Sequence, residues 1–472
     1  IGLDQPANTV LLFETARELE GAAGYFALAA QSAAGVFAVD EASRLAHRGI
    51  ALLRRQGPSP QRAGLELGLQ LVLGSSAAVM GGYAAAEAMA AMERARSLAE
   101  ELGDTPQLSP ALWGLFAYYL VRGDIPKALD ICKQSMHIAM QHKGEMALMT
   151  AHASMGITLR FTGKYEEAVE HFEKAEALYD PSRQGEYLAL YHMDPGVFSL
   201  AEMTRTLWGA GFVDRALDTA DNALALAKRS PDPRTLAFAL LLRAVMHVML
   251  RDPAAVLDDS DQGIAIADEH QIVQERAWLT TSRGWALASL GKVDEGIEEL
   301  SASLAMRQRM NANLDLPFAL SQLADAYRIR GDIDRARQTL QQAIETANRN
   351  HDVWSQSDIY RMLGDLARVD EGTIGDGNSE DISADTEVRA AAAEAYYLRA
   401  LEIARKQGAR SFELRAAVRL AKLMMDSGRA AEGRALVAPI RSFFDGQRAT
   451  ADTAEADEVL AFHSRMETQP AS

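Results

Sequence analysis

Phosphate binding by a glycine-rich loop is the first chemistry to look for in this 472-residue chain. Such a loop has the pattern Gly-x-x-x-x-Gly-Lys-Ser/Thr, in which backbone N–H groups surround the phosphates. The nearest candidate runs from Gly156 to Gly163, but the two glycines are too far apart, and Tyr165 stands where Ser or Thr is needed. The Gly-x-Ser-x-Gly pattern of serine hydrolases and the His-Glu-x-x-His pattern of zinc proteases are also absent. The sequence therefore predicts no catalytic residues and a segment that is not an enzyme.

Cysteine and histidine are common zinc ligands, and Cys132, His137 and His142 lie close together in the sequence. Five residues turn an α-helix by about 500°, so these side chains do not share one helical face. A solvated or half-buried helix explains them better than a metal site. Cys132 is the only cysteine, which excludes a disulfide framework and indicates a reducing, cytoplasmic compartment. We expect no metal and no other cofactor.

An acidic stretch without a single basic residue runs from Asp370 to Glu387. Some of its residues fit the calcium-ligand positions of an EF-hand loop, but Asp381 stands where that loop needs glycine for its sharp turn. The matching residues are Asp376, Asn378, Glu380 and Glu387. We interpret residues 370–387 as a disordered acidic loop between two helices rather than as a calcium site.

The best single polar candidate is His192 beside Asp194. Asp194 and Pro195 also fit the start of a helix, because Asp is a favoured N-cap and Pro a favoured first-turn residue. We favour the helix-cap interpretation and keep His192 and Asp194 as a candidate polar contact for a ligand.

The elements that position these residues follow from an internal repeat. A glycine followed five residues later by alanine or glycine recurs, with an apolar helical pattern on each side. Neighbouring copies are 40 residues apart from 123 to 163 and from 291 to 331. Glycine ends one helix in a conformation open to positive φ, and the small residue lets two helices approach closely. The pattern predicts helix–turn–helix hairpins whose clear turns are at Gly123, Gly163, Gly211, Gly291, Gly331 and Gly428.

These glycine and alanine positions resemble those of the tetratricopeptide repeat (TPR) family, whose common period is 34 residues. The resemblance implies an all-α fold in which ten hairpins, with a period near 40, form a right-handed superhelical solenoid. We expect an N-terminal helical repeat or cap over residues 1–60, next to a junction with an upstream NTPase module. The superhelix covers residues 61–450 and contains the 370–387 loop, and residues 451–472 form a C-terminal cap and tail.

A TPR array lines its concave groove with one face of the first helix of each hairpin. Trp and Arg dominate binding hot spots, and Met supplies adaptable apolar contacts. Counting back from each turn predicts a groove that is aromatic in the middle and alternates Arg and Asp toward its C-terminal part. The predicted groove residues are Trp113, Phe161, Phe198, Arg205, Trp208, Met246, Trp278, Arg283, Trp285, Arg328, Arg361 and Asp365.

Two alternatives stay open for the predicted groove residues. The tryptophans line the groove, or they belong to the core between repeats. Arg283 lies eight residues before Gly291, where other units place Leu or Met. A charged residue at a core position is costly unless it is paired. Snorkelling of the side chain, or a local change of register, explains Arg283 better than a ligand-binding role.

Several phrases resemble the carboxy-terminal TPR region of bacterial multidomain proteins described as predicted ATPases: Leu102–Leu115, Tyr191–Gly196, Arg283–Leu287 and Tyr396–Gly408. In that group a nucleotide cyclase or transcription-factor domain precedes a STAND-type NTPase module, and the repeats come last. The resemblance implies a non-catalytic sensor or scaffold that regulates the upstream domains. Its groove would bind a protein, a peptide or a small-molecule effector. The first residue, Ile1, fits a piece of a longer protein. A free-standing TPR adaptor for protein assembly is the alternative.

Charge and hydropathy exclude two classes of partner. The chain has 48 basic and 65 acidic side chains and a formal net charge of -17, whereas nucleic-acid binding needs a basic face. The longest apolar run, Leu65 to Met80, is interrupted by polar residues and falls short of the ~20 apolar residues that a membrane span needs. We expect neither nucleic acid nor membrane as a partner of this segment.

Overall fold

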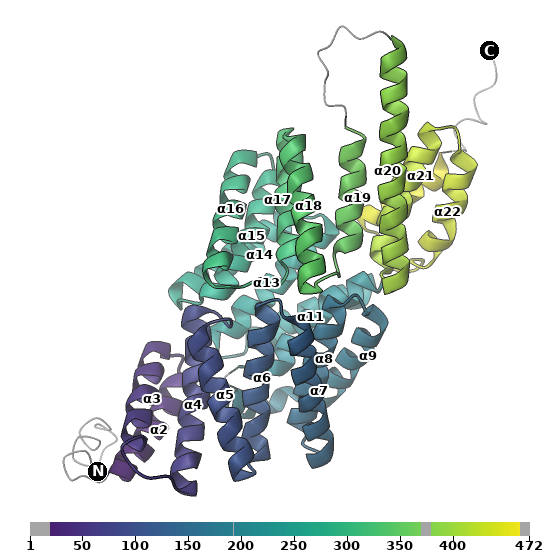
Figure 1. Ribbon diagram of the computed structural model, residues 1–472. Helices are drawn as coiled ribbons and strands as arrows, with labels where there is room; N and C mark the ends of the chain where they lie inside the picture. Colours follow the sequence, from purple (N-terminus) through teal and green to yellow (C-terminus); the bar gives the residue numbers. More distant parts are fainter. Residues whose placement is uncertain (1–18, 192, 370–378, 463–472) are drawn as a thin grey trace.

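The computed structural model describes residues 19–191, 193–369 and 379–462, and every regular element in these ranges is a helix. The helices pair into hairpins that follow one another along the chain (Figure 1). The first five hairpins are α2 (Leu19–Gly35) with α3 (Val39–Leu53), α4 (Pro60–Gly81) with α5 (Ala86–Leu102), α6 (Thr105–Val121) with α7 (Ile125–His142), α8 (Glu145–Phe161) with α9 (Tyr165–Leu178), and α11 (Pro195–Gly209) with α12 (Val213–Ala227).

Five more hairpins and a final helix complete the described chain. They are α13 (Pro233–Leu250) with α14 (Pro253–Glu269), α15 (Val273–Ser289) with α16 (Val293–Arg309), α17 (Leu316–Arg330) with α18 (Ile333–Asn350), α19 (Gln356–Ala367) with α20 (Ser379–Gln407), α21 (Arg410–Asp426) with α22 (Ala430–Ser442), and then α23 (Ala451–Ala461). The all-helical repeat solenoid is therefore confirmed.

Small residues at the turns explain the close packing within each hairpin. Gly123 adopts a φ of +78°, which glycine reaches without steric cost. Asp124 then caps α7, because its side chain accepts a hydrogen bond from the N–H of Lys127 at 3.3 Å. Ala128, five residues after the glycine, and its counterpart Ala168 are both fully buried. The alanine of the repeat thus fills the crowded position predicted for it.

The longest interval between turns contains an element that the repeat did not predict. Between α9 and α11 the chain forms a short 3-10 helix, η1 (Pro181–Arg183), and an extra helix, α10 (Gln184–Tyr191). Their length accounts for the wider spacing between Gly163 and Gly211.

The acidic stretch differs from its prediction as a loop over residues 370–387. Helix α20 begins at Ser379, so the stretch from that residue onward is helical. Acidic residues are favourable near a helix N-terminus, which explains how an acidic stretch can lead into the following alanine-rich helix. Residues 370–378 lie outside the described residues, and the EF-hand candidates Asp376 and Asn378 lie there with them.

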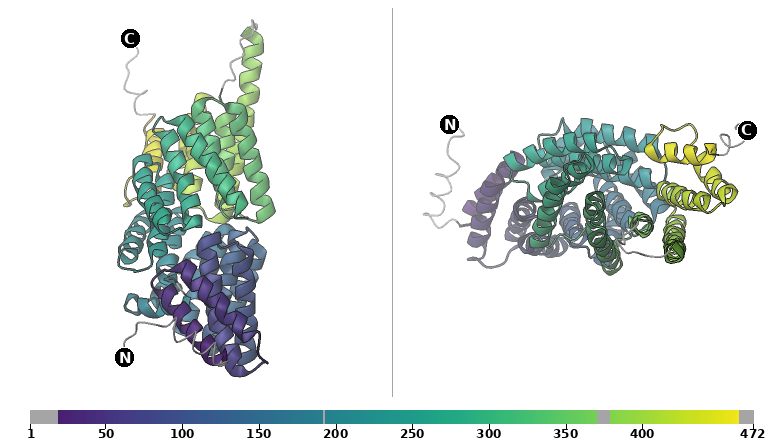
Figure 2. Two further views of the ribbon diagram at one scale, coloured as in Figure 1. Left: turned by 90° about the vertical axis from the view of Figure 1, so that its left-hand side faces the viewer. Right: turned by 90° about the horizontal axis from the view of Figure 1, so that it is seen from above.

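The hairpins stack in two tiers. Helices α2–α12 form the first tier, the lower one in Figure 1, and α13–α23 form the second; Figure 2 shows the same stacking from the side. The N–H of Asn313 donates to the carbonyl of Val121 at 2.8 Å, and the N–H of Val353 donates to the carbonyl of Phe161 at 2.9 Å. The partners of such contacts are 189 to 203 residues apart in the sequence. We call this line of contacts the seam. It joins first-tier turns near residues 83, 122, 162 and 211 to second-tier segments near residues 274, 313, 353 and 411.

Two helices, α4 and α13, are long and apolar enough to cross a membrane by length and composition alone. In both, most residues of the apolar window are buried by the rest of the protein. Burial of this kind is usual for core helices, so the two helices are weak evidence for a membrane segment.

Glycine at the seam is needed for two reasons. Gly211 has a φ of +95°, and a Cβ added there would lie 2.8 Å from Cβ of Arg410 and 2.6 Å from a ring carbon of Phe443, both in the second tier. Gly291 occupies the same kind of turn with a φ of +93°, yet an added Cβ would meet nothing within 4 Å. Positive φ is common to both turns, whereas contact with the other tier is specific to Gly211.

We expect Gly211→Ala to lower the free energy of unfolding by about 1–3 kcal/mol more than Gly291→Ala, because only the first adds a methyl group to a closely packed interface. Urea denaturation of both variants and of the parent, followed by circular dichroism, measures the difference. Equal losses in the two variants would show that the seam does not resist the extra methyl group.

Candidate functional site

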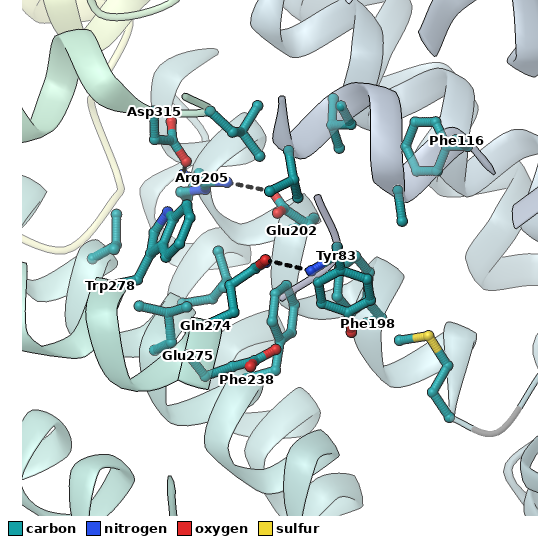
Figure 3. A pocket seen from close by; sticks show the side chains of 18 of the residues that line it. Tyr83, Phe116, Phe198, Glu202, Arg205, Phe238, Gln274, Glu275, Trp278 and Asp315 are labelled. Carbon is teal, nitrogen blue, oxygen red and sulfur yellow. Dashed lines mark hydrogen bonds and ion pairs between the residues drawn. The ribbon is translucent and has the colours of Figure 1, made fainter. Parts of the chain in front are cut away.

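A pocket lies inside the solenoid, where the inner faces of several hairpins converge (Figure 3). Helix α6 contributes Trp113, Phe116 and Ala117, whose spacing of three and four residues places them on one helical face. Helix α11 also comes from the first tier, whereas α13, α15 and the loop residue Asp315 come from the second. The pocket holds about 680 Å³ free of protein atoms, open solvent included. Both tiers therefore form its walls.

Six of the nineteen residues that line the pocket are aromatic. The ring of Trp113 lies edge-on to Phe198 with a centroid distance of 5.8 Å, and Phe198 stacks on Phe238 at 3.8 Å. Trp278 lies on another side of the same space (Figure 3). Aromatic pairs of this kind make a stiff surface with ring faces that attract cations. The polar residues of the wall are Tyr83, Glu202, Arg205, Gln274, Glu275 and Asp315.

One end of the pocket is a buried ion network that joins the tiers. Arg205 donates to Oε2 of Glu202 at 2.6 Å and to Oδ2 of Asp315 at 2.8 Å. Trp354 donates from Nε1 to the other oxygen of Asp315 at 2.9 Å. Burial alone would lower the pKa of Arg205, but the carboxylates of Asp315 and Glu202 outweigh it and raise that pKa. Arg160, which is fully buried, also reaches Oε2 of Glu202, at 3.5 Å.

A second carboxyl group lies directly behind this network. Asp352 is fully buried and accepts a hydrogen bond from the N–H of Asp315 at 2.9 Å. Burial, and then the nearby charge of Asp315, raises the pKa of Asp352 to about 8. Arg307 lies over the ring of Trp278 at 4.1 Å and donates to the carbonyl of Leu314; burial lowers its pKa to about 10. The carboxyl group of Asp352 therefore keeps its proton at neutral pH, beside the ion pairs of the network.

Four of the twelve predicted groove residues line this pocket: Trp113, Phe198, Arg205 and Trp278. Their shared place on inner helical faces is the one that the repeat predicted. That they bind a ligand stays a prediction.

Three other predicted groove residues are buried elsewhere: Phe161, Trp208 and Met246. The ring of Trp208 meets Phe412 edge-on across the seam at 5.1 Å, and the hydroxyl of Ser411 donates to the carbonyl of Trp208 at 2.5 Å. Phe161 lies under the guanidinium of Arg160 at 3.8 Å. Trp208 lies in the seam, where the second tier covers a face that a single open array would leave free, whereas Phe161 and Met246 lie in the hydrophobic core.

The C-terminal predicted residues meet at a second hollow, which we call the charged cleft. Arg361 donates to Asp358 at 2.6 Å and to Asp365 at 2.5 Å. Trp285 donates to the carboxylate of Asp325, a residue of the cleft wall, at 3.1 Å. The charged residues of the wall are Arg251, Asp325, Arg328, Arg361, Asp365, Arg415, Arg419, Asp452 and Glu455. The predicted alternation of Arg and Asp is present, and its members pair with one another.

The remaining predicted residues are held by structural contacts. Arg283 is not among the residues that line the pocket or the charged cleft; it is about a quarter exposed and pairs with Asp261 at 2.6 Å and with Glu299. Its side chain therefore snorkels from a core position toward partners. Asp194 is the N-cap of α11, accepting hydrogen bonds from the N–H groups of Gly196 and Val197. His192 lies outside the described residues.

Metal-binding chemistry finds no support in the part of the chain that the structure describes, where no cluster of three or more His, Cys, Asp or Glu side chains could hold an ion. Cys132 is fully buried and hydrogen-bonded to Thr158, and burial raises the pKa of its thiol to about 12. Its neighbour His137 contacts Gln141 on an exposed face instead.

Several residues around the pocket were not predicted from the sequence: the carboxyl groups of Glu202 and Glu275 and the rings of Tyr83, Phe238 and Trp354. Glu202 lies one helical turn after Phe198, but neither Glu202 nor Phe238 falls at a position counted back from its turn, so the repeat carried no signal for them. Tyr83 and Trp354 lie in connecting segments and acquire their partners through the seam, for which the repeat has no signal.

Comparisons with known proteins agree with this architecture. A tetratricopeptide repeat model matches residues 150–180 and 319–350. Two hairpins, α8 with α9 and α17 with α18, thus match tetratricopeptide repeats. A model of anaphase-promoting complex subunit 5 matches residues 71–121 and 198–275.

One curated relative and two solved structures show how far the likeness extends. An uncharacterized protein of Rhizobium meliloti (strain 1021) is 22% identical over 333 residues, which cover 70% of this chain and 30% of that protein. The Rap protein complexed with competence and sporulation factor aligns with a TM-score of 0.53 and 13% identity, over 82% of this chain and 99% of Rap. A STAND protein with a TPR sensor from Pyrococcus horikoshii aligns with a TM-score of 0.42 and 10% identity, over 89% of this chain and 56% of that protein. The chain thus spans less than a third of the length of this curated relative, and it shares its fold with Rap.

We expect Asp352→Asn to make stability less sensitive to alkaline pH. The folded-state pKa of about 8 lies above the unfolded value of about 3.9, so the protonated carboxyl stabilises the fold at low pH and this contribution is lost as pH rises toward 8. The melting temperature of the variant relative to the parent should therefore increase between pH 5 and pH 8.5. Asp130→Asn, at an exposed position, is the control. A difference that stays constant with pH would contradict the assignment.

Proposed function

We propose that this TPR chain is a non-catalytic sensor arm of a larger cytoplasmic signalling protein. A peptide, a protein segment or a small effector binds in the interior pocket. Its binding changes how firmly the two tiers hold together. The change passes to an NTPase, nucleotide cyclase or transcription-factor module in the same chain.

The shared construction of the pocket is the observation that carries this proposal. Trp113 and Phe198 come from the first tier, whereas Trp278 and Asp315 come from the second. A ligand that touches both walls binds the closed arrangement better than one in which the tiers separate. Such differential affinity is what a ligand needs in order to shift a conformational equilibrium.

The comparisons support the proposal in two respects. The Rap protein, whose fold this chain shares, forms a complex with competence and sporulation factor. The relative from Rhizobium meliloti extends well beyond the matched region, which leaves room for other domains. The TPR architecture itself serves protein–protein interaction, and the regulatory role is our extension of it.

A free-standing adaptor is the second candidate, and the charged cleft favours it. Five arginines and four carboxylates line this hollow on the second tier. A surface of alternating charges selects partners by electrostatic complementarity. An adaptor would use this cleft and would not need the interior pocket.

We expect Ala117→Trp to fill the pocket and to abolish ligand binding there, because Ala117 lies in its wall. Ligands found by thermal-shift screening of peptides and metabolites should slow hydrogen exchange of the seam amides Asn313 and Val353 in the parent but not in Ala117→Trp. Ala225→Trp, on an exposed helical face, is the control and should behave as the parent does.

Two results would contradict the sensor proposal. Ligands that bind Ala117→Trp as tightly as the parent do not use the interior pocket. Ligands that bind the pocket without slowing hydrogen exchange of the seam amides do not change how firmly the two tiers hold together. A partner that loses affinity only on charge reversal at Arg328 in the charged cleft would favour the adaptor instead.

A further inference from the structure

The interior pocket has more acidic than basic groups in its wall. Glu202, Glu275 and Asp315 supply three carboxyl groups, whereas Arg205 is the only basic side chain among the residues that line it. Arg205 is already engaged by Glu202 and Asp315. Glu275, on helix α15, is therefore the acid of the wall that Arg205 does not engage.

Glu275 has an oxygen without a partner. The residue is 2% exposed, and no described residue donates a hydrogen bond to its Oε1. Both ion pairs of Glu202, with Arg160 and Arg205, use Oε2. Figure 3 shows Glu202 and Glu275 in the wall of the pocket, with Gln274 drawn between them. A buried carboxylate oxygen without a hydrogen-bond donor is costly, so Oε1 of Glu275 is suited to a donor that arrives with a ligand.

The groups around Glu275 do not supply that donor. Arg234 faces it from α13 and favours its ionised form, while Asp232, at the start of the same helix, opposes it. Tyr83 faces it from the turn between α4 and α5. Burial outweighs the attraction of Arg234 and raises the pKa of Glu275 to about 7. Near neutral pH this carboxyl group is divided between its two forms, and a cation beside it would favour the ionised one.

Resting on the proposed function, we propose that the interior pocket binds an organic cation, a protonated amine on an aromatic or branched aliphatic body. Glu275 receives the amine, and Glu202 accepts a second hydrogen bond where the ligand offers one. The body lies among Trp113, Phe198 and Trp278, whose ring faces also attract positive charge. A free small-molecule amine and a lysine side chain between apolar residues of a peptide share this chemistry.

Titration calorimetry with the full chain tests the inference with three matched probes. They are 2-phenylethylamine, 2-phenylethanol and 3-phenylpropanoate, which are similar in shape and differ in charge. We expect the amine to bind at least tenfold more tightly than the alcohol or the acid. Equal affinities for the amine and the alcohol would overturn the inference. A peptide with lysine between two leucines, against the same peptide with norleucine, tells the peptide source from the small-molecule source.

Two variants locate the charge. Glu275→Gln keeps the size of the side chain and should weaken binding of the amine at least tenfold, while binding of the alcohol stays unchanged. Glu170→Gln, on an exposed face of α9, is the matched control and should bind as the parent does. An amine that binds Glu275→Gln as tightly as the parent would show that Glu275 is not its acceptor.

The pH profile supplies a readout that a merely structural role would not move. The ionised form of Glu275 is the one that binds, so affinity for the amine should fall as pH falls through about 7 and approach a tenfold loss per unit below it. Glu275→Gln should give a flat profile from pH 6 to 8, and a flat profile in the parent would contradict the inference. If other ligands still protect the seam while the amine fails to bind, the cation inference fails and the sensor proposal stands.

Discussion

The structure depends on one constraint: the superhelix returns over itself, so that each turn of the first tier meets a segment of the second tier. In a TPR array without this return, each repeat touches only its neighbours, and stability is a sum of local terms. Here the hydrogen bond from Val353 to Phe161 joins hairpins that are far apart along the chain. The seam converts an extended array into a closed body, and it turns what would be an open groove into an enclosed pocket.

Closure also explains why so many charges are buried. Arg205, Glu202 and Asp315 are each at least nine-tenths buried, and such ions are tolerated only when their geometry satisfies one another. Glu202 belongs to the first tier and Asp315 to the second, so Arg205 is paired fully only when the tiers are in register. An apolar interface of the same area would hold the tiers together but would let one tier slide along the other. The ion network specifies one alignment.

The sequence predicts the features that depend on neighbouring residues, and it does not predict the contacts between residues that are far apart in the chain. Gly123 and Ala128 predict a hairpin, because the turn at the glycine and the close helix contact at the alanine depend on neighbouring residues. The inner-face positions of Trp113 and Trp278 were predictable because a helical face can be counted from a turn. The repeat pattern predicted Trp208 in the groove, yet the ring of Phe412 covers the Trp208 side chain. The two rings meet because of the pitch of the superhelix, which no local sequence pattern predicts. Glu275 escaped notice because an acidic side chain on a helix is usually solvated.

The separation across the seam has a consequence for synthesis. Asn313 leaves the ribosome after its partner Val121 by the time needed to add about 190 residues, on the order of 10–40 s at bacterial and eukaryotic elongation rates. Until then the first tier exists as a half-built solenoid whose upper edge is bare. The rings of Trp208 and Phe161 and the charge of Arg160 face solvent or a chaperone during this interval. The seam contacts therefore form late in synthesis, because each needs a partner about 190 residues further along the chain.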